Sequence, residues 1–336
     1  MKPLLLSEIA RMTGGRLHGD DRLVDAVATD TRALGGLGSA LFVALKGERF
    51  DGHDHVAAAA HAGVAAALVS RHVDAALPQV VVADTERALA GIATAVQLGR
   101  SATVIAITGS NGKTSVKALT QAILERAGRT YATPGNRNNE IGMPLAVIDA
   151  PEDARFAIYE MGTGKPGDIA YLTAIARPDI GLVNNVAPAH IERMGSLLAI
   201  ADTKAAVYDD LPGDGVAVIN ADDAFAPYFA ERAHGRRLIR FGLDHGADVS
   251  ARDVALGEDG SRFVLVTPDG EAPVALAMVG GGVQTAQEGA VVKTPKTGKD
   301  RNMAGAPEQV GAGRRGSAPE RISEELPVGQ AQHAGL

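Results

Sequence analysis

The stretch TVIAITGSNGKT, residues 103–114, decides how the rest of the chain is interpreted. It begins with β-branched and apolar residues, which are typical of a strand buried on both faces, and then changes at once to Gly109, Gly112, Lys113 and Thr114. Glycines let backbone N–H groups turn toward an anion, a helix starting near Lys113 adds its positive end, and a threonine hydroxyl at this position is a ligand for Mg²⁺. The stretch therefore predicts a phosphate-binding loop, and a glycine-rich turn that binds nothing is the alternative.

The composition limits the class of protein. The chain has 336 residues, of which 46% are hydrophobic and 4% aromatic, with no tryptophan and no cysteine. A core of Ala, Val, Leu and Ile suits packed α/β layers, and the length allows two or three domains. The absence of cysteine excludes disulfides, thiol catalysis and cysteine-ligated zinc.

The net charge and the apolar runs limit the partners and the location. A formal charge of -7 argues against a protein that coats nucleic acid or an anionic membrane. No stretch reaches the roughly 20 apolar residues of a membrane span. The first residues are too charged, and their apolar run too short, for a signal peptide. We therefore expect a cytoplasmic monomer with no nucleic-acid partner and no membrane span.

Short apolar runs alternate with helical segments after residue 85. With helices between most of the runs, this order predicts a doubly wound, mostly parallel sheet, which we assign to a central domain of residues 85–280. The strands predicted after the phosphate loop cover residues 130–132, 156–159, 180–183, 216–219 and 238–241.

Polar side chains follow nearly every predicted strand, at the sheet edge where ligands bind in such folds. Next to a phosphate loop that needs Mg²⁺, Glu160 and His190 are candidate metal-site groups; a solvated strand end and a structural histidine are their alternatives. Lys204, on a helix predicted at residues 197–208, is interpreted as a surface lysine. The polar residues at this edge are Asn136, Asn138, Asn139, Glu160, Asn184, Asn185, His190, Asn220 and Asp222.

The first 84 residues predict a small α/β domain. We expect a first helix capped by Ser7 and ended by Gly14, followed by strands at residues 41–45, 66–69 and 80–82. Two polar clusters interrupt this pattern, one at residues 29–32 and one at residues 46–49. Lys46 and Gly47 follow a strand directly, so they either face a phosphate-bearing ligand or form a solvated turn. We assign His53, His55 and His61 to loop and helix-surface positions instead of a metal site.

The end of the chain has a different pattern. Residues 250–256, 261–267 and 273–279 predict short antiparallel strands, with Asp-Gly turns at 259–260 and 269–270. Residues 281–336 contain no aromatic residue and no apolar periodicity. Such a segment cannot bury enough apolar surface to offset its ordering entropy, so we expect this tail to be disordered.

Five motifs together resemble one protein family. In chain order they are LFVALKGERFDGH, ITGSNGKTSVK, NRNNEIGMPLAV, YEMGTGKPGDIAYL and NNVAPAHIERMGSLLAIADTKAAVYDDLP. This order resembles the Mur ligases over residues 4–280, and within them the member that joins D-alanyl-D-alanine to UDP-N-acetylmuramoyl-tripeptide. The resemblance implies ATP-driven amide bond formation in the cytoplasmic stage of peptidoglycan synthesis. The tripeptide carboxylate would attack the γ-phosphate, and the amine of the dipeptide would then attack the resulting acyl phosphate.

The resemblance also implies roles for individual residues. Lys113 would hold the β- and γ-phosphates, Thr114 and Glu160 would bind one Mg²⁺, and His190 would bind a second. Lys204 matches a lysine that family members carry in carbamylated form near the second metal. Two residues after that lysine the family often has an acidic residue, and this chain has Ala206.

The remaining implied contacts fall into two sets. The residues implied to bind nucleotide are Thr108, Gly109, Ser110, Asn111, Gly112, Lys113, Thr114, Ser115 and, near the adenine, Asn220. The residues implied to bind the muramoyl peptide and its uridine nucleotide are Asn138 and Asn139 in the central domain, and Thr31, Arg32, Lys46 and Gly47 in the first domain.

The chain departs from the family after residue 280. Family members continue into a Rossmann-like C-terminal domain that closes on ATP, whereas the sequence here reads like a wrong frame or a truncated gene. Three functions follow as hypotheses: the ligase, a catalytically impaired nucleotide-binding remnant of it, and a P-loop hydrolase with no ligase ancestry. We expect nucleotide binding to survive in this chain and ligase turnover to be impaired. Amide formation separates the first two hypotheses, and nucleotide binding alone does not.

Overall fold

The computed structural model describes residues 1–34, 36, 38–188, 191–244, 246–258 and 260–277. The tail that the sequence predicts to be disordered, residues 281–336, lies outside these described residues. Within the described residues, no helix combines the length and the apolar composition that a membrane span needs.

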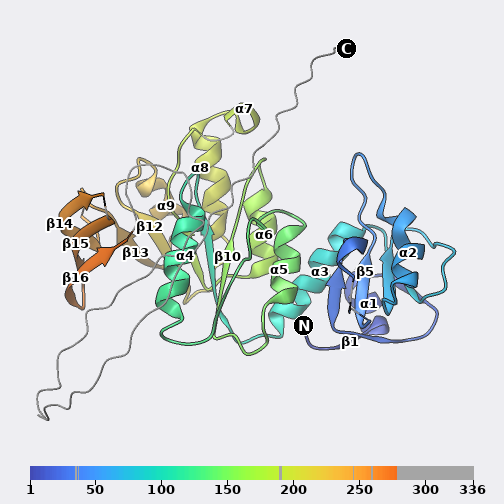
Figure 1. The fold of residues 1–336 in the computed structure, drawn as a ribbon. Helices are drawn as coiled ribbons and strands as arrows, with labels where there is room; N and C mark the ends of the chain where they lie inside the picture. Colours follow the sequence, from blue (N-terminus) through green and yellow to red (C-terminus); the bar gives the residue numbers. More distant parts are fainter. Residues whose placement is uncertain (35, 37, 189–190, 245, 259, 278–336) are drawn as a thin grey trace, which may run out of the picture. The chain divides into compact units, whose positions relative to one another are not determined.

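A six-stranded, fully parallel sheet contains the phosphate loop (Figure 1). Its strand order is β13-β12-β11-β8-β10-β9, so β8 lies inside the sheet, directly before the loop. The chain moves to one side of β8 for β9 and β10 and crosses to the other side for β11 to β13. Such a reversal next to the first strand is the place where doubly wound sheets bind ligands. The strand bounds are β8 Thr103–Thr108, β9 Thr130–Ala132, β10 Phe156–Glu160, β11 Ile180–Val183, β12 Val216–Asn220 and β13 Arg237–Phe241.

Alternate residues of the central strands pack on opposite faces of this sheet, as the pleat requires. Ile105 and Ile107 of β8 join Ile158 of β10 in a cluster that α4 covers with Val116 and Leu124. Helix α4, Lys113–Leu124, which begins at the end of the phosphate loop, therefore covers this face of the sheet.

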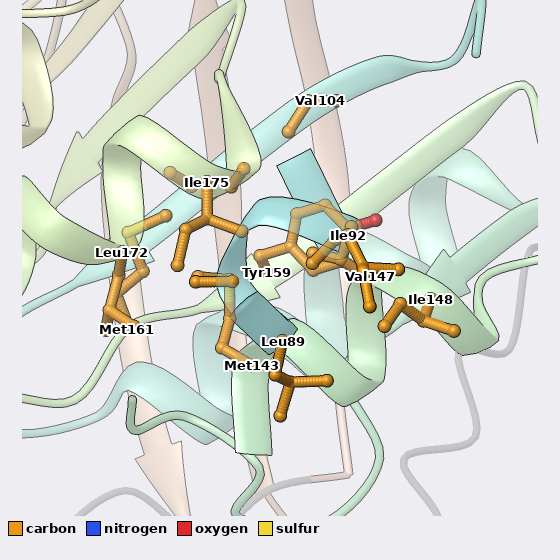
Figure 2. Close-up of a cluster of buried hydrophobic side chains, with 14 of the residues drawn as sticks. Leu89, Ile92, Val104, Met143, Val147, Ile148, Tyr159, Met161, Leu172 and Ile175 are labelled. Carbon is orange, nitrogen blue, oxygen red and sulfur yellow. The ribbon is translucent and has the colours of Figure 1, made fainter. Parts of the chain in front are cut away.

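The other face carries a larger apolar cluster, which Figure 2 shows. Val104 of β8 and Tyr159 of β10 meet Leu172 of α6 and Val147 of α5 in this cluster. Helix α3 also contributes to it and packs on α1, α5 and α6. The Tyr159 hydroxyl donates a hydrogen bond to Gln97 of α3 at 3.1 Å. The helix bounds are α3 Thr85–Leu98, α5 Gly142–Asp149 and α6 Asp168–Ala176.

A second, five-stranded sheet lies within the first 84 residues, in the order β2-β7-β6-β5-β4. Only the β2–β7 pair is antiparallel. Strand β5 alternates in the same way as β8: Leu41 and Val43 belong to the cluster that contains α1, while Ala40 and Phe42 belong to the one that contains α2. The bounds are β1 Leu4–Leu5, α1 Leu6–Thr13, β2 Arg16–His18, β3 Leu23–Val24, β4 Ala26–Ala28, η1 Thr31–Ala33, β5 Ala40–Val43, η2 Gly52–His55, α2 Val56–His61, β6 Ala66–Val69 and β7 Gln79–Val81.

A small antiparallel sheet, β14-β15-β16, follows the parallel sheet in the chain. The structure thus confirms the predicted α/β class, the parallel sheet and the short antiparallel part. The third strand of this small sheet begins at Gly270, three residues before the predicted start, and pairs with β15 from its first residue. The remaining bounds are α7 Ile191–Met194, α8 Leu197–Ala205, η3 Ala206–Tyr208, α9 Ala226–Arg232, β14 Ser250–Gly257, β15 Gly260–Thr267 and β16 Gly270–Leu276.

The prediction that Ser7 caps the first helix is wrong. Helix α1 begins at Leu6, so Ser7 lies inside its first turn. The Glu8 carboxylate accepts a hydrogen bond from the Leu5 N–H at 2.8 Å, and the Ser7 hydroxyl instead donates to Asp21 at 2.6 Å. A carboxylate three residues into the helix thus satisfies the backbone donor at the helix start. Gly14 ends the helix in the left-handed conformation, as expected.

Candidate functional site

The phosphate loop joins β8 to α4 and has the features of an anion site. Gly112 precedes α4 at φ +73°, and no side chain caps the helix, so no side chain occupies its first backbone N–H groups. A Cβ on Gly109 would lie 2.9 Å from the Asn184 Cβ, so only glycine fits there without a shift of the neighbouring chain. The Lys113 ammonium donates to the carbonyls of Gly109 at 2.8 Å and Ser110 at 3.3 Å. A loop with this geometry presents N–H groups and one cation to a bound phosphate.

The segment that follows β11 holds the phosphate loop in place. The Asn111 N–H donates to the Asn185 side chain at 2.9 Å, and the Asn184 side-chain amide donates to the Asn111 carbonyl at 2.8 Å. The Ser110 hydroxyl and the backbone of Ala187 exchange two hydrogen bonds, at 3.1 and 2.9 Å. The conformation of the loop is thus fixed by polar residues at the end of a neighbouring strand.

Glu160, at the end of β10, collects polar groups from three segments. Its carboxylate accepts hydrogen bonds from the Thr114 hydroxyl at 3.1 Å and from the Asn138 side-chain amide at 3.0 Å. It also forms an ion pair with Lys117 at 3.0 Å. The Glu160 side chain is only 4% exposed, so it is not a solvated strand end. Its role as a metal ligand stays a prediction.

Lys204 on α8 is buried, and its interpretation as a surface lysine is wrong. The residue is 2% exposed. Burial, with a smaller contribution from the nearby Lys113 ammonium, lowers the pKa of Lys204 to about 7. Burial also lowers the pKa of Lys113, and the charge of Glu160 opposes that effect. These effects place Lys113 within electrostatic reach of Lys204 and of Glu160.

A cavity of about 700 Å³ lies beside Glu160. Asn138 and Asn139 line it, as do the cationic side chains of Lys165 and Arg193. Tyr171 also lines it, and within the described part of the chain its buried hydroxyl has no hydrogen-bond partner. Burial raises the pKa of Tyr171 to about 12, so this hydroxyl stays protonated and can donate to a ligand.

Asn220, at the end of β12, contacts the segment after β11 that holds the phosphate loop, and it also lines a second cavity. Its side-chain amide donates to the Asn184 carbonyl at 3.0 Å, and its side-chain oxygen accepts from the Asp222 N–H at 3.0 Å. Asn220, Phe241 and Ser250 are among the residues that line this second cavity, whose volume is about 360 Å³. The contact of Asn220 with adenine stays a prediction.

The other residues of the expected nucleotide site lie along the same strand, loop and helix. Thr108 is buried, and its hydroxyl donates to the Met161 carbonyl at 3.0 Å. Ser115 is half-buried in the first turn of α4. His190, the expected ligand of a second metal, lies outside the described residues.

The candidate uridine-nucleotide residues follow two neighbouring parallel strands, β4 and β5. Arg32 is exposed, and its guanidinium forms a fork on the Asp30 carboxylate, which lowers the pKa of Asp30 to about 2. Thr31 starts the short helix η1 beside it. Lys46 and Gly47 follow β5, and a Cβ on Gly47 would lie 2.4 Å from the exposed Phe50 ring, so a larger residue there would require the ring to move.

Comparison with protein families decides what kind of protein this arrangement belongs to. A model described as the Mur ligase middle domain matches residues 107–284, more than half of the chain. The chain belongs to the Mur ligase family. A second model, described as the Mur ligase family catalytic domain, matches residues 23–97. The resemblance drawn from the five motifs is thereby confirmed.

Named relatives narrow the similarity to one kind of Mur ligase. The chain is 40% identical, over 281 residues, to UDP-N-acetylmuramoyl-tripeptide–D-alanyl-D-alanine ligase of Escherichia coli, covering 83% of this chain and 62% of the relative. The corresponding ligase of Bacillus subtilis is 36% identical, over 77% of this chain and 57% of that relative. The chain therefore spans about three fifths of the length of these two ligases.

Solved structures of Mur ligases agree with this similarity. The crystal structure of MurF from Acinetobacter baumannii superposes with a TM-score of 0.79 at 32% identity, covering 83% of this chain and 62% of the other. The MurF ligase of Thermotoga maritima, solved in complex with ADP, gives a TM-score of 0.68 at 29% identity, covering 75% of this chain and 58% of the other.

The structure adds residues that the sequence did not single out. Lys117 lies one turn after Lys113, at the spacing that places two side chains on one face of a helix. This four-residue spacing on an amphipathic helix is the sequence signal that could have placed Lys117 on the same face as Lys113. Lys165, Tyr171 and Arg193 come from segments with no strand-end position, so only the folded chain brings them to the cavity.

Proposed function

We propose that this Mur ligase family member binds ATP with Mg²⁺ at the phosphate loop and joins D-alanyl-D-alanine to UDP-N-acetylmuramoyl-tripeptide through an acyl phosphate. The observation that carries the proposal is the meeting of Lys113, Thr114 and Glu160 at one edge of the parallel sheet, with the buried Lys204 within electrostatic reach of Lys113. The similarity to ligases named for this reaction supports the choice of substrates.

Charge neutralisation is the main task of such a site, because the first step brings a carboxylate to a nucleoside triphosphate. The Lys113 ammonium and the uncapped start of α4 would offset the phosphate charges. To bind a phosphate, the Lys113 side chain would rotate away from the two loop carbonyls. It would exchange two neutral acceptors for a charged phosphate oxygen, and hydrogen bonds between charged groups are stronger.

The oxygen atoms of Thr114 and Glu160 fit a magnesium ion. Mg²⁺ prefers oxygen ligands at about 2.1 Å in octahedral geometry, which places neighbouring ligands about 3 Å apart. The Thr114 hydroxyl and the Glu160 carboxylate are 3.1 Å apart. When bound, Mg²⁺ supplies positive charge to the phosphoryl oxygens as the carboxylate attacks.

Lys204 suits the carbamylated role that the family resemblance implies. A neutral amine adds to CO₂, losing one proton and forming an N–C bond, and the product is a carboxylate-like oxygen ligand. With a pKa of about 7, a substantial fraction of Lys204 is neutral near neutral pH, whereas a solvated lysine is almost fully charged. His190 completes the proposed second metal site.

The cavity beside Glu160 suits the muramoyl peptide. Asn138 and Asn139 offer amide groups to such a substrate. The charged side chains that line the cavity have both signs, with Lys165 and Arg193 available to substrate carboxylates and Glu140 and Asp168 available to substrate donors. We assign the uridine nucleotide to Thr31, Arg32, Lys46 and Gly47 in residues 1–84, and the ATP to residues 85–280.

Calorimetry and product analysis together test this function. Mg-ATP and then UDP-N-acetylmuramoyl-tripeptide are titrated into the purified chain, and the mixture is analysed by mass spectrometry after D-alanyl-D-alanine is added. The proposal predicts magnesium-dependent nucleotide binding and an amide product that requires all three substrates. Nucleotide binding with no amide product would support the nucleotide-binding remnant instead. ATP hydrolysis that proceeds without any muramoyl peptide would identify an unrelated hydrolase.

A further inference from the structure

Lys117 is a buried lysine with a full set of acceptors. Its side chain is 8% exposed. The ammonium donates to the carbonyls of Thr133 at 2.9 Å and Gly135 at 3.1 Å, and pairs with the Glu160 carboxylate at 3.0 Å. An ammonium has three N–H donors, so these three acceptors satisfy all of them.

The contacts of Lys117 connect two parts of the site. Glu160 is the carboxylate that also accepts from Thr114 of the phosphate loop. Thr133 and Gly135 belong to the segment that leads to Asn138, whose amide reaches the same carboxylate and lines the cavity. One ammonium therefore links the carboxylate beside the phosphate loop to the chain segment that forms the cavity wall.

We propose that Lys117 is a positioning residue that holds the Glu160 carboxylate in its metal-binding orientation and ties it to the 133–138 segment of the substrate cavity. This inference rests on the proposed function, because it assigns Glu160 to Mg²⁺. Groups that hydrogen-bond a metal ligand and orient it have effects of about 10- to 100-fold on metal affinity when they are removed. Lys117 is such a group for Glu160, because its ammonium contacts Oε2, the same carboxylate oxygen that accepts from the Thr114 hydroxyl.

The geometry gives Lys117 a task that an apolar side chain cannot perform. Without the ammonium, the Glu160 carboxylate would keep, within the described part of the chain, the hydrogen bonds from Thr114, a proposed Mg²⁺ ligand, and from Asn138, which lines the cavity. The carboxylate would then be free to rotate with whichever ligand is bound. With Lys117 in place, the carboxylate oxygen that faces Thr114, Oε2, is also held by a buried ammonium that is not among the residues lining the cavity.

Magnesium titrations of four variants of the full chain test the proposal. The Mg²⁺ concentration that gives half-maximal ADP binding is measured by calorimetry for Lys117→Met, Glu160→Gln, the double variant Lys117→Met/Glu160→Gln, and the control Gln121→Met. The control removes a half-buried polar side chain from the same helix, where Gln121 donates to Glu125 at 2.8 Å. We expect Lys117→Met to raise the half-maximal concentration at least tenfold and Gln121→Met to leave it within twofold.

The double variant separates positioning from a general structural role. If Lys117 acts through Glu160, removing it from the Glu160→Gln chain produces no further change in the magnesium requirement. A further loss of tenfold or more in the double variant would overturn the proposal, and so would a Lys117→Met chain that unfolds at a lower temperature yet keeps the wild-type magnesium requirement. Should Lys117→Met fail to fold, the comparison of the double variant with Glu160→Gln alone decides, since neither buried charge remains in the double variant. Failure of the wild-type chain to bind Mg-ADP would contradict the proposed function itself.

Discussion

Replacing Lys204 with methionine should make the chain more stable, by an amount that depends on pH. The Lys204 side chain is buried, and its pKa falls from the ordinary 10.5 to about 7 on folding. Between these two values the unfolded chain holds a proton that the folded chain has released. The free energy of unfolding therefore rises with pH in this window, by about 1.4 kcal/mol per pH unit.

The size of the effect follows from the width of that window. Below about pH 7 the lysine is charged in both states, and the buried charge destabilises the folded chain by about 5 kcal/mol relative to a lysine with an unshifted pKa. At pH 9, about two pH units above the folded-state pKa, the buried lysine is almost entirely neutral, and the destabilisation is smaller by about 2.7 kcal/mol. Methionine keeps the apolar stem and has no proton to lose.

Urea unfolding followed by circular dichroism measures this difference in CO₂-depleted buffer, where the amine is not carbamylated. The advantage of Lys204→Met over wild type should shrink by about 2.7 kcal/mol between pH 6 and pH 9. Lys2→Met is the control, because the Lys2 side chain is 72% exposed, and its difference from wild type should not change with pH. A Lys204→Met difference that stays constant to within about 0.5 kcal/mol over this range would refute the reasoning, because the pH slope of 1.4 kcal/mol per unit would be absent.

Two further substitutions test the loop and the support of α5. Gly112→Ala should lower the free energy of unfolding by about 1–2 kcal/mol, because alanine is strained in the left-handed backbone conformation of this residue. It should also weaken nucleotide binding, since the new Cβ would lie 2.9 Å from the Asn184 amide nitrogen. Gly63→Ala, at φ +85° with open space around it, is the control and should leave nucleotide binding unchanged. Arg100→Met should lower the free energy of unfolding by about 2–4 kcal/mol, because the buried Arg100 donates to the carbonyls of Ile148 and Ala150 near the end of α5. The matched control is Arg129→Met, which removes an exposed ion pair with Asp153. It should change the free energy of unfolding, measured in urea, by less than about 1 kcal/mol. Equal losses for Arg100 and Arg129 would contradict the assigned role of the buried guanidinium.

The parallel sheet could be predicted because its strands carry a strong local signal. The apolar runs of β8 to β13 stand between polar segments, and the structure places each strand within one residue of the predicted bounds. The strands β2 and β4 were not predicted. Each has three residues, and these include exposed or half-buried positions that give no continuous apolar run. Pairing with β7 and β5 defines these strands, and such pairing is not local in sequence.

The site residues also divide into those with a local sequence signal and those placed by contacts with distant segments. Thr114 and Glu160 could be selected because a phosphate motif and a strand end are visible in the sequence. Lys204 could not be recognised as buried from its own helix, whose apolar residues lie on more than one face. Lys117 was missed because a lysine on an amphipathic helix is ordinarily a solvated side chain, and only the carbonyls of Thr133 and Gly135, brought in by another segment, make its burial possible.

The most direct test of the central claim is the affinity of the chain for ADP, measured by calorimetry with and without Mg²⁺, in wild type and in Lys113→Met. If the edge of the sheet at Lys113, Thr114 and Glu160 binds a nucleotide with its metal ion, wild type binds one ADP per chain. Removing Mg²⁺ or the Lys113 ammonium should then each weaken binding at least tenfold, or about 1.4 kcal/mol. Equal affinity in all four measurements, or no binding to the wild-type chain, would contradict the account.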